Sequence, residues 1–355
     1  MKNFLEGKKV LITGHSGFKG SWLAQVLLNW GADITGISLP PDTRPSLFQI
    51  LNIKKEVKNY FVDIRDFEKV KNIFQKEKPE IVFHLAAQAI VRDSYDKPLE
   101  TYTTNVIGTA NILEATKEIR CVKSAVVITS DKVYENKESP FPYKESDALG
   151  GYDPYSASKA AADIAANSYI QSFFNPDDYG TKHNTLVAIA RAGNVIGGGD
   201  WADHRLVPDI VRSVYEKKEN IIIRNPQAVR PWQHVLEPLS GYLALAERLH
   251  KGEKEISGVW NFGPDDESFV PVEKLANEVI GMLGKGTIDI RPDATKHEAN
   301  ILKLDINKAK TILDWQPKFN FQENLQYTID WYKNYYEKIK DPEELTNEQI
   351  KSFFN

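Results

Sequence analysis

Short runs of β-branched and other apolar residues alternate with longer amphipathic segments over the first half of the chain. The short runs predict buried strands, and the amphipathic segments predict helices. Strands separated by helices of this length indicate a parallel sheet covered on both faces. The predicted strands are Lys9–Thr13, Ala32–Ile37, Tyr60–Val62, Ile81–His84, Ala125–Thr129 and Thr185–Arg191, and the helices are Phe18–Trp30, Phe67–Glu77, Leu99–Ile119 and Pro154–Phe174.

The alternation ends after Arg191, where Gly193–Asp200 has the composition of a loop. We expect an α/β fold: a Rossmann-type doubly wound parallel sheet from residues 1–192, joined by 235–263, and a smaller C-terminal α/β substrate-binding domain from 193–234 and 264–340. Residues 341–355 are expected to be a charged tail with no predicted function. The later helices are predicted at Leu206–Lys217, Val235–Leu249, Val272–Leu283, Asn307–Leu313 and Phe321–Tyr336, and the strands at Ile221–Arg224, Val259–Phe262 and Ile288–Ile290.

Composition narrows the class of partner. Charged residues make up 26% of the chain and the formal net charge is −4, so no positive excess favours nucleic acid. No apolar run is long enough to span a membrane, and no segment resembles a signal peptide. A lone cysteine, Cys121, fits a reducing compartment. We expect a cytoplasmic protein that acts on a small molecule, with no nucleic-acid, membrane or metal partner.

Three glycines lie directly between the first predicted strand and the first predicted helix. Gly14, Gly17 and Gly20 have the spacing GxxGxxG rather than GxGxxG. Glycine permits a tight turn and lets the backbone approach a pyrophosphate, which the start of the helix then stabilises. The position predicts a dinucleotide-binding loop that includes Phe18 and Lys19.

The choice between NAD and NADP stays open in the sequence. An acid at the end of the second strand is typical of NAD-binding proteins, but Ser38 stands there and Asp42 comes late. Arg44 could contact a 2′-phosphate, so NADP is not excluded. Asp63, after the third strand, fits either an acceptor for the adenine amine or an ordinary helix N-cap.

Tyr155 and Lys159 lie four residues apart on a predicted helix, and so on one face. A nearby ammonium and a positive nicotinamide ring should lower the pKa of the phenol, so that it can take a proton from a sugar hydroxyl. Such pairs are common on helix surfaces, so the neighbouring residues decide whether this pair is catalytic. Ser130, Asp131 and Lys132 follow the fifth predicted strand, where sites lie in such sheets. They are candidates for a hydrogen-bond donor, a general acid and a second proton-transfer group.

An anionic substrate would need local arginines, because the chain as a whole is negative. Arginine forks suit a pyrophosphate, whereas tryptophans fit either stacking on a base or packing in the core. The first candidate is Arg230, followed by Asn194 and Arg191 and more weakly by Arg205 and Arg291, with Trp201 and Trp232 as the aromatic residues.

Several sequence motifs are similar to those of a known family. Through them the chain, from about Lys8 to Tyr336, resembles the extended short-chain dehydrogenase/reductase family in its NAD-dependent epimerase/dehydratase branch. The phrases are the glycine loop, Leu85–Gln88 (LAAQ), Asn105, Ser130–Asn136 (SDKVYEN), Leu149–Tyr155 (LGGYDPY) with Lys159, Arg191–Trp201 (RAGNVIGGGDW) and Val229–Pro238 (VRPWQHVLEP).

The resemblance implies NAD as cofactor, a nucleotide sugar as substrate, and a homodimer or homotetramer packed through the helices near Leu99–Ile119 and Pro154–Phe174. The phrases favour CDP-glucose. The implied cofactor-binding residues are Gly14, Gly17, Phe18, Lys19, Gly20, Asp63, Ile64, Leu85, Ala86, Ala87, Gln88, Asn105, Tyr155 and Lys159, and the implied substrate-binding residues are Arg191, Asn194, Arg205, Leu206, Arg230, Trp232 and Arg291.

The reaction implied by the resemblance is a dehydration in deoxysugar biosynthesis. Tyr155 takes the proton of the C4 hydroxyl as hydride passes from C4 to NAD⁺, water leaves across C5 and C6 with a proton from Asp131, and hydride then returns from NADH to C6. Related dehydratases carry a carboxylate in place of Lys132, and an ammonium cannot accept the C5 proton. Either the pKa of Lys132 is strongly lowered, or it stabilises the enolate and another group is the base.

Two other functions compete with this interpretation. The first is a related nucleotide-sugar enzyme: either a dehydratase that acts on another nucleotide sugar, or a 4-epimerase or C3/C5-type isomerase, which would share Tyr155 and Lys159 but would need neither Asp131 nor Lys132. A binding module that senses NAD(P) without chemistry is the second alternative, and the intact Ser130, Tyr155 and Lys159 disfavour it.

Overall fold

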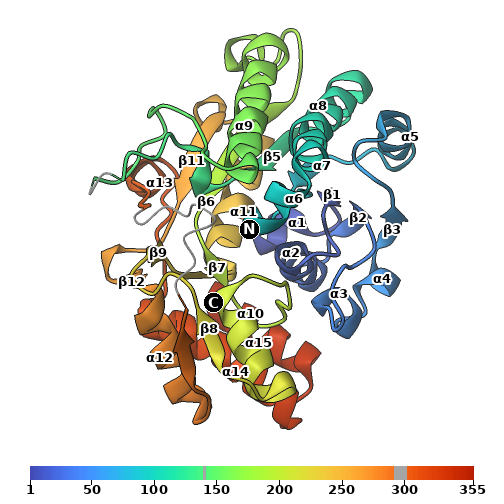
Figure 1. The fold of residues 1–355 in the computed structure, drawn as a ribbon. Helices are drawn as coiled ribbons and strands as arrows, with labels where there is room; N and C mark the ends of the chain where they lie inside the picture. Colours follow the sequence, from blue (N-terminus) through green and yellow to red (C-terminus); the bar gives the residue numbers. More distant parts are fainter. Residues whose placement is uncertain (139–140, 292–301) are drawn as a thin grey trace.

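The computed structural model describes residues 1–138, 141–291 and 302–355, and it is built on one seven-stranded parallel sheet (Figure 1). Neighbouring strands pair in parallel throughout. This confirms the predicted α/β fold with a Rossmann-type sheet. The strand order is β11 (Gly258–Phe262), β6 (Leu186–Ala192), β5 (Ser124–Ile128), β4 (Ile81–His84), β1 (Lys9–Thr13), β2 (Asp33–Ser38) and β3 (Lys58–Phe61).

The central strands are apolar on both faces because both faces are covered. Successive side chains of a strand point to opposite faces, and here they enter two separate cores. Ile12 and Val126 belong to one core, whereas Leu11 and Val127 belong to the other. The first core contains α2 (Phe18–Asn29) and α11 (Leu236–His250), and the second contains α5 (Phe67–Glu77), α8 (Gly108–Ile119) and α9 (Pro154–Phe173).

Two predicted helices are interrupted. The segment predicted as one helix over Leu99–Ile119 consists of α7 (Pro98–Tyr102), a π-helical turn η1 (Thr103–Ile107) and α8. The helix predicted over Leu206–Lys217 becomes α10 (Leu206–Arg212) and a second π-helical turn, η4 (Ser213–Lys217). Apolar periodicity does not reveal such turns, which often mark functional sites. The first of them carries Asn105.

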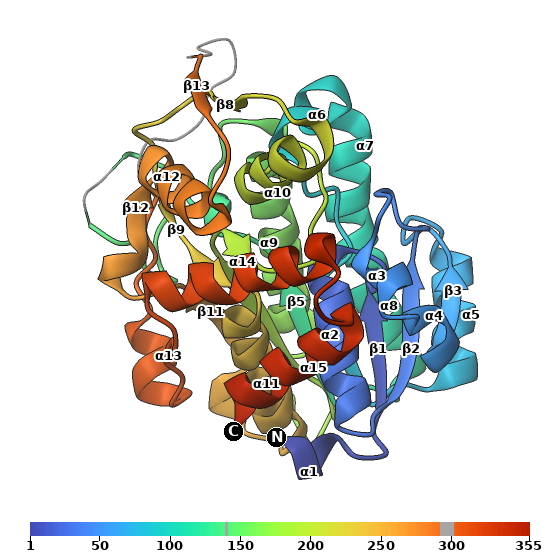
Figure 2. The same cartoon turned by 90° about the horizontal axis from the view of Figure 1, so that it is seen from below.

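Figure 2 shows β8, β13 and α10 far from the two chain termini, whereas α15 lies beside α11 and close to both termini. In the described part of the chain after β6, the strands outside the large sheet form two-stranded sheets, β10 with β7, β12 with β9, and β13 with β8. Across the described residues, no helix combines the length and apolar composition of a membrane-spanning segment. The elements are β7 (Val195–Ile196), β8 (Ile221–Ile223), β9 (Val229–Pro231), β10 (Gln233–His234), β12 (Phe269–Pro271), α12 (Val272–Leu283), β13 (Ile288–Ile290), α13 (Asn307–Ile312), α14 (Phe321–Glu337) and α15 (Pro342–Phe354).

The short elements are mostly single turns between the larger ones. They are α1 (Lys2–Leu5), α3 (Leu47–Ile50), α4 (Ile53–Glu56), α6 (Val91–Asp96), η2 (Asp131–Val133), η3 (Pro176–Asp178), η5 (Lys254–Ile256) and η6 (Asp266–Ser268).

The predicted boundaries between the two domains stay a prediction. The segment 235–263, which was expected to join the first domain, contains β11, and β11 is an edge strand of the large sheet.

The C-terminal segment is a packed helix, although its charged composition suggested a tail. Asp341 caps α15 by accepting hydrogen bonds from the N–H groups of Glu343 and Glu344. Phe353 is only 2% exposed, and Thr346 accepts a hydrogen bond of 2.9 Å from the indole of Trp331 on α14. The helix therefore completes the apolar core around α14 and α2.

Substitution of Phe353 by alanine should lower the free energy of unfolding by about 3–5 kcal/mol, because it empties a buried aromatic position. Denaturant unfolding followed by circular dichroism measures this. Lys351→Ala, on the exposed face of the same helix, should change stability by no more than about 0.5 kcal/mol. Equal effects of the two substitutions would contradict the packed position of α15.

Candidate active site

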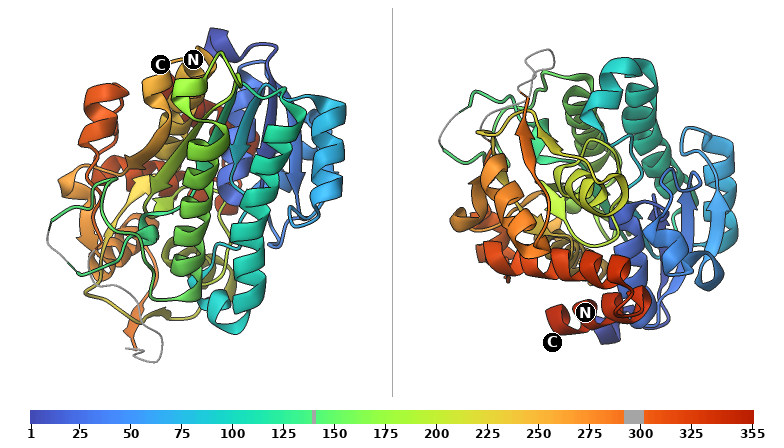
Figure 3. Two further views of the ribbon diagram at one scale, coloured as in Figure 1. Left: turned by 90° about the horizontal axis from the view of Figure 1, so that it is seen from above. Right: turned by 60° about the horizontal axis from the view of Figure 1, so that its bottom comes forward.

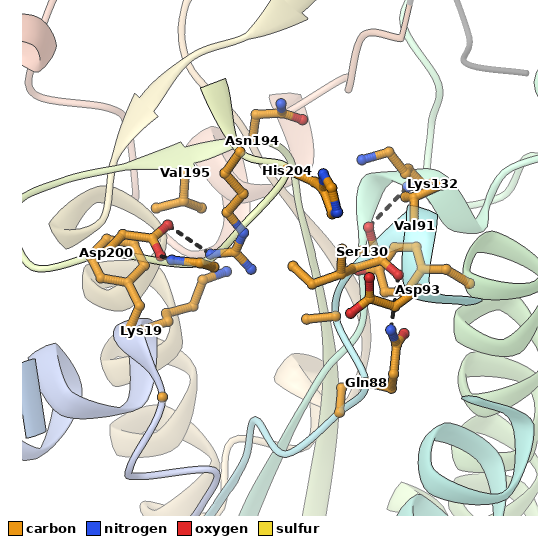
Figure 4. A pocket seen from close by; sticks show the side chains of 18 of the residues that line it. Lys19, Gln88, Val91, Asp93, Ser130, Lys132, Asn194, Val195, Asp200 and His204 are labelled. Atoms are coloured by element: carbon orange, nitrogen blue, oxygen red, sulfur yellow. Dashed lines mark hydrogen bonds and ion pairs between the residues drawn. The ribbon is translucent and has the colours of Figure 1, made fainter. Parts of the chain in front are cut away.

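A cavity of about 980 Å³ opens at the carboxyl ends of the central strands, where ligands bind in doubly wound sheets. The glycine loop after β1, the segment after β5 and the start of α9 all line it. Figure 4 shows Ser130 and Lys132 on one side, facing Lys19 and Asp200 across the open space. The cavity thus gathers residues that lie far apart in the chain.

The glycine loop has the shape of a phosphate cradle. Gly14 has a φ of +75°, which favours glycine. A Cβ on Gly20 would lie 2.1 Å from the Gly14 carbonyl oxygen, so the helix can approach the turn closely only with glycine there. Gly17 precedes α2, and no described side chain caps the first turn of that helix. Its N–H groups therefore suit a pyrophosphate, and Phe18 and Lys19 line the same wall.

The Leu85–Gln88 segment forms the next part of the wall, and Asn105 holds it from behind. The Gln88 N–H donates to the Asn105 amide oxygen at 2.8 Å, and the Asn105 amide donates to the Gln88 carbonyl at 3.1 Å. Asn105 also donates to Ser158 on α9. Leu85, Ala86, Ala87 and Gln88 line the cavity, whereas Asn105 is not among its lining residues. Among the described residues its contacts support the loop.

Acidic groups gather at the end of the cavity near β2 and β3. Asp42, Asp63 and Ile64 line it. Asp63 does not cap α5, because Asp66 does so. Instead, Asp63 accepts hydrogen bonds from the backbone N–H and guanidinium of Arg65. Ser38 donates to the Ser16 hydroxyl and the Leu39 carbonyl.

Tyr155 and Lys159 enter the cavity from the first turns of α9. Pro154 begins this helix, and Asp153 caps it by accepting a hydrogen bond from the Ser156 N–H. The Lys159 ammonium donates to the Ile128 carbonyl at the end of β5, at 2.9 Å. Both side chains are nearly buried, with Tyr155 9% and Lys159 5% exposed. The predicted shared face therefore points into the site.

Burial dominates the electrostatics of this pair. It raises the pKa of Tyr155 to about 12, a hydrogen bond with Ser130 opposes the rise, and the charge of Asp131 adds to it. Burial also lowers the pKa of Lys159 to about 8, against the charge of Asp163. We expected the ammonium and a positive nicotinamide ring together to lower the pKa of the phenol, and in the protein without the ring the pKa is raised instead. Desolvation penalises the phenolate more than the surrounding charges favour it.

The segment after β5 places a carboxylate beside the pair. Ser130 accepts a hydrogen bond from the Lys132 N–H at 3.2 Å and so begins the turn η2. Its hydroxyl donates to Oδ1 of Asp131 at 3.0 Å. Asp131 is 2% exposed, and its Oδ2 has no hydrogen-bond partner in the described part of the chain. A buried carboxylate oxygen without a partner costs free energy, which is typical of groups that act on a ligand.

Lys19 has a stronger electrostatic role than the sequence suggested. Burial, together with the charges of Arg205 and Lys159, lowers its pKa to about 7, against the opposing charge of Asp131. Asp200 was not among the residues predicted from the sequence; it is 4% exposed and binds Arg205 at 2.8 Å on the opposite wall. Its only sequence signal is its place in the phrase GGGDW.

The predicted substrate residues divide into two groups. Asn194, Arg205, Leu206, Arg230 and Trp232 line the cavity. The described lining includes neither Arg191 nor Arg291. Arg191 is 2% exposed and binds Asp163 with both ends of its guanidinium, at 2.8 and 2.7 Å, so it is not available to a substrate phosphate. Arg291 is exposed and pairs with Asp289 at 2.6 Å.

Trp201 supports the wall with its ring packed inside. It is 3% exposed, packs edge-on against Trp331 and donates to the Tyr336 hydroxyl at 3.0 Å. Trp232 is 5% exposed and donates to the Val270 carbonyl. Within the described ranges, His, Cys, Asp and Glu side chains nowhere gather as a metal site.

The chain is similar to nucleotide-sugar dehydratases. It is 48% identical over 333 residues to a CDP-glucose 4,6-dehydratase of Salmonella typhimurium, covering 94% of this chain and 92% of the relative. It is 26% identical to the human dTDP-D-glucose 4,6-dehydratase, over 95% and 93% of the two chains.

Solved structures agree with the fold. The structure of dTDP-glucose 4,6-dehydratase from Bacillus anthracis in complex with NAD has a TM-score of 0.75 and 25% identity, covering 94% of this chain and 100% of the other. A family model, GDP-mannose 4,6 dehydratase, matches residues 11–328. The chain therefore belongs to the GDP-mannose 4,6 dehydratase family of the extended short-chain dehydrogenases/reductases.

Proposed function

We propose that this protein removes water from CDP-glucose to give CDP-4-keto-6-deoxyglucose, with NAD as a recycled cofactor. One observation carries the proposal. The Asp131 carboxylate, with its unpartnered buried oxygen, lies in the same cavity as Tyr155 and Lys159. An epimerase needs the pair but no buried acid beside it. The 48% identity to the Salmonella CDP-glucose 4,6-dehydratase supports the same substrate.

The cofactor side of the cavity favours NAD over NADP. The glycine loop and the start of α2 would hold a pyrophosphate. Asp42 lines the adjoining end, where its negative charge disfavours a 2′-phosphate, whereas Asp63 is paired there with Arg65, which lines the same end. Arg44 does not belong to the described lining. NAD, when bound, supplies a hydride acceptor for C4, a hydride donor for C6 and a positive charge that favours the phenolate.

The chain's own groups would move the protons. Tyr155 takes the proton of the C4 hydroxyl while Ser130 hydrogen-bonds the same oxygen. Lys159, fixed to the Ile128 carbonyl, stabilises the negative phenolate. Asp131 gives a proton to the C6 hydroxyl as it leaves as water. We assign Lys132 to electrostatic stabilisation of the enolate that forms as C5 gives its proton to solvent in the cavity, and C5 takes a proton back from solvent when hydride returns to C6.

The substrate diphosphate would lie against Arg205 and Arg230, with Asn194 between the two sides of the site. Asp200 holds Arg205 in place. We place the reaction in the cytoplasm, where the lone Cys121 would remain a thiol.

A homodimer through α7, α8 and α9 is the proposed assembly. These helices pack side by side on one face of the sheet (Figure 3). Large apolar side chains are exposed there, with Leu99 at 80%, Ile107 at 51% and Ile164 at 56%. Exposed apolar groups on adjacent helices mark an interaction surface.

The double substitution Ile107→Lys and Ile164→Lys places charges on this surface and should halve the mass of the particle measured by light scattering. An unchanged mass would exclude this face as the dimer interface.

Incubation of CDP-glucose with the protein and NAD in D₂O should give a product that has lost one water and carries one deuterium at C5. Mass spectrometry followed by NMR measures both changes. UDP-glucose and GDP-mannose serve as matched substrates and should react more slowly. An unchanged mass with an inverted C4 centre would instead support an epimerase. An unchanged substrate would remove the dehydratase proposal.

Tyr155→Phe and Asp131→Asn should block different steps. Tyr155→Phe removes the proton acceptor for oxidation and should lower kcat by about 100- to 10,000-fold without any intermediate. Asp131→Asn keeps the oxidation but cannot protonate the leaving hydroxyl. It should therefore release some CDP-4-ketoglucose, which is lighter than the substrate by two hydrogens. Mass spectrometry of quenched reactions separates the outcomes, and rapid full dehydration by Asp131→Asn would disprove the assigned role.

A further inference from the structure

The ion pair of Asp163 and Arg191 lies directly behind the active site. The two side chains are 1% and 2% exposed, and they bind through two hydrogen bonds of 2.8 and 2.7 Å. Burial opposes the charge of Arg191, but the Asp163 carboxylate outweighs it and raises the pKa of the guanidinium. A buried ion pair is a weak source of net stability, because desolvation offsets most of its attraction. The position of this ion pair therefore says more about its function than its contribution to stability does.

Asp163 also binds the strand that carries the proposed acid. Its Oδ2 accepts a hydrogen bond of 3.0 Å from the hydroxyl of Thr129, the residue before Ser130. Asp163 stands one helical turn after Lys159 on α9, and the Lys159 ammonium donates to the Ile128 carbonyl. The strand end is thus joined to the helix at two successive residues, Ile128 and Thr129, whose partners lie one turn apart on α9. We call Asp163, Arg191 and Thr129 the Asp163 brace.

Arg191 extends the connection to the segment after η2. Its Nη1 donates to the Tyr134 hydroxyl at 2.9 Å and to the Glu145 carbonyl at 3.1 Å. Tyr134 in turn donates to Asn261 on β11 at 2.7 Å. The brace therefore fixes both ends of the short segment that contains Ser130, Asp131 and Lys132.

We propose that Asp163 is a positioning residue for the dehydration: it holds the helix that bears Tyr155 and Lys159 in register with the strand end that bears Ser130 and Asp131. The inference rests on the proposed function, because it assigns the brace to that reaction. A displacement of about 1 Å between reacting groups costs about 100-fold in rate. Two connections at adjacent positions restrict such a displacement.

The charge of Asp163 has a second effect, on Lys159. Burial lowers the pKa of Lys159 to about 8, and Asp163 opposes this. The other groups facing Lys159 are Lys19 from α2, His84 from β4 and Tyr155 on its own helix. Burial lowers the pKa of His84 to about 3, so it stays neutral. Loss of the Asp163 charge should therefore lower the pKa of Lys159 further, and the ammonium should be lost at lower pH.

Asp163→Asn keeps the shape of the side chain and tests the proposal. It should lower kcat for CDP-glucose about 100-fold, with KM changed less than threefold, since the substrate-binding side is untouched. The alkaline limb of the kcat profile should move down by about one pH unit. Hydrogen exchange by mass spectrometry should become faster in the peptide 124–134, which needs no turnover to be measured.

Glu237→Gln is the matched control. Glu237 is 1% exposed and accepts N–H bonds from Lys318 and Phe319, but it does not line the described cavity. It should leave kcat, the alkaline limb and the exchange of 124–134 unchanged. If Asp163→Asn does not fold, Thr129→Val removes only the hydroxyl donor and should lower kcat about tenfold with faster exchange of the same peptide.

The outcomes separate the two proposals. No conversion of CDP-glucose by the unsubstituted protein would reject the proposed function, whatever the variants do. Conversion by the unsubstituted protein, together with an unchanged rate, pH limb and exchange in Asp163→Asn, would overturn the positioning role. An equal loss in Glu237→Gln would also overturn it, because any buried carboxylate would then have the same effect.

Discussion

A parallel sheet buried on both faces is the constraint on which the rest of this structure depends. Parallel strands need crossover helices, and these helices cover both faces of the sheet. All carboxyl ends of the strands therefore meet at one edge. The glycine loop after β1, the Leu85–Gln88 segment after β4, Ser130 to Lys132 after β5 and Asn194 after β6 are neighbours for this reason. The cavity follows from the topology, and loops of differing sequence supply its chemistry.

Burial then decides the protonation of the groups that the edge collects. The same loss of water raises the pKa of Tyr155 and lowers the pKa of Lys159 and Lys19. Each of these shifts favours the neutral form, although Lys159, with a pKa of about 8, still carries its charge at neutral pH. A bound cation or anion would change them most strongly, because water does not screen charges there. The site is thus prepared to respond to the charges of its ligands.

Arg191 shows how buried charge can serve geometry. An arginine within a family phrase suggested contact with a substrate phosphate, yet its guanidinium is enclosed by Asp163, Tyr134 and the Glu145 carbonyl. Arg205 and Arg230 line the cavity instead, and Asp200 holds Arg205 in place. Arg191 is buried behind the site and Arg205 lines the cavity, and each is paired with an aspartate.

The sequence by itself determined the α/β class, the strands of the sheet, the glycine loop between the first strand and the first helix, and the gathering of Ser130, Asp131, Tyr155 and Lys159. These depend on local signals: apolar runs, glycine spacing and residues placed at strand ends or one helical turn apart. Tertiary structure alone decided which arginines face the cavity, where Asp200 lies, that Asn105 supports a loop and that α15 is packed. Those properties depend on contacts between distant segments, such as Asp163 with Thr129 and Arg191, and on how completely water is excluded around each charge.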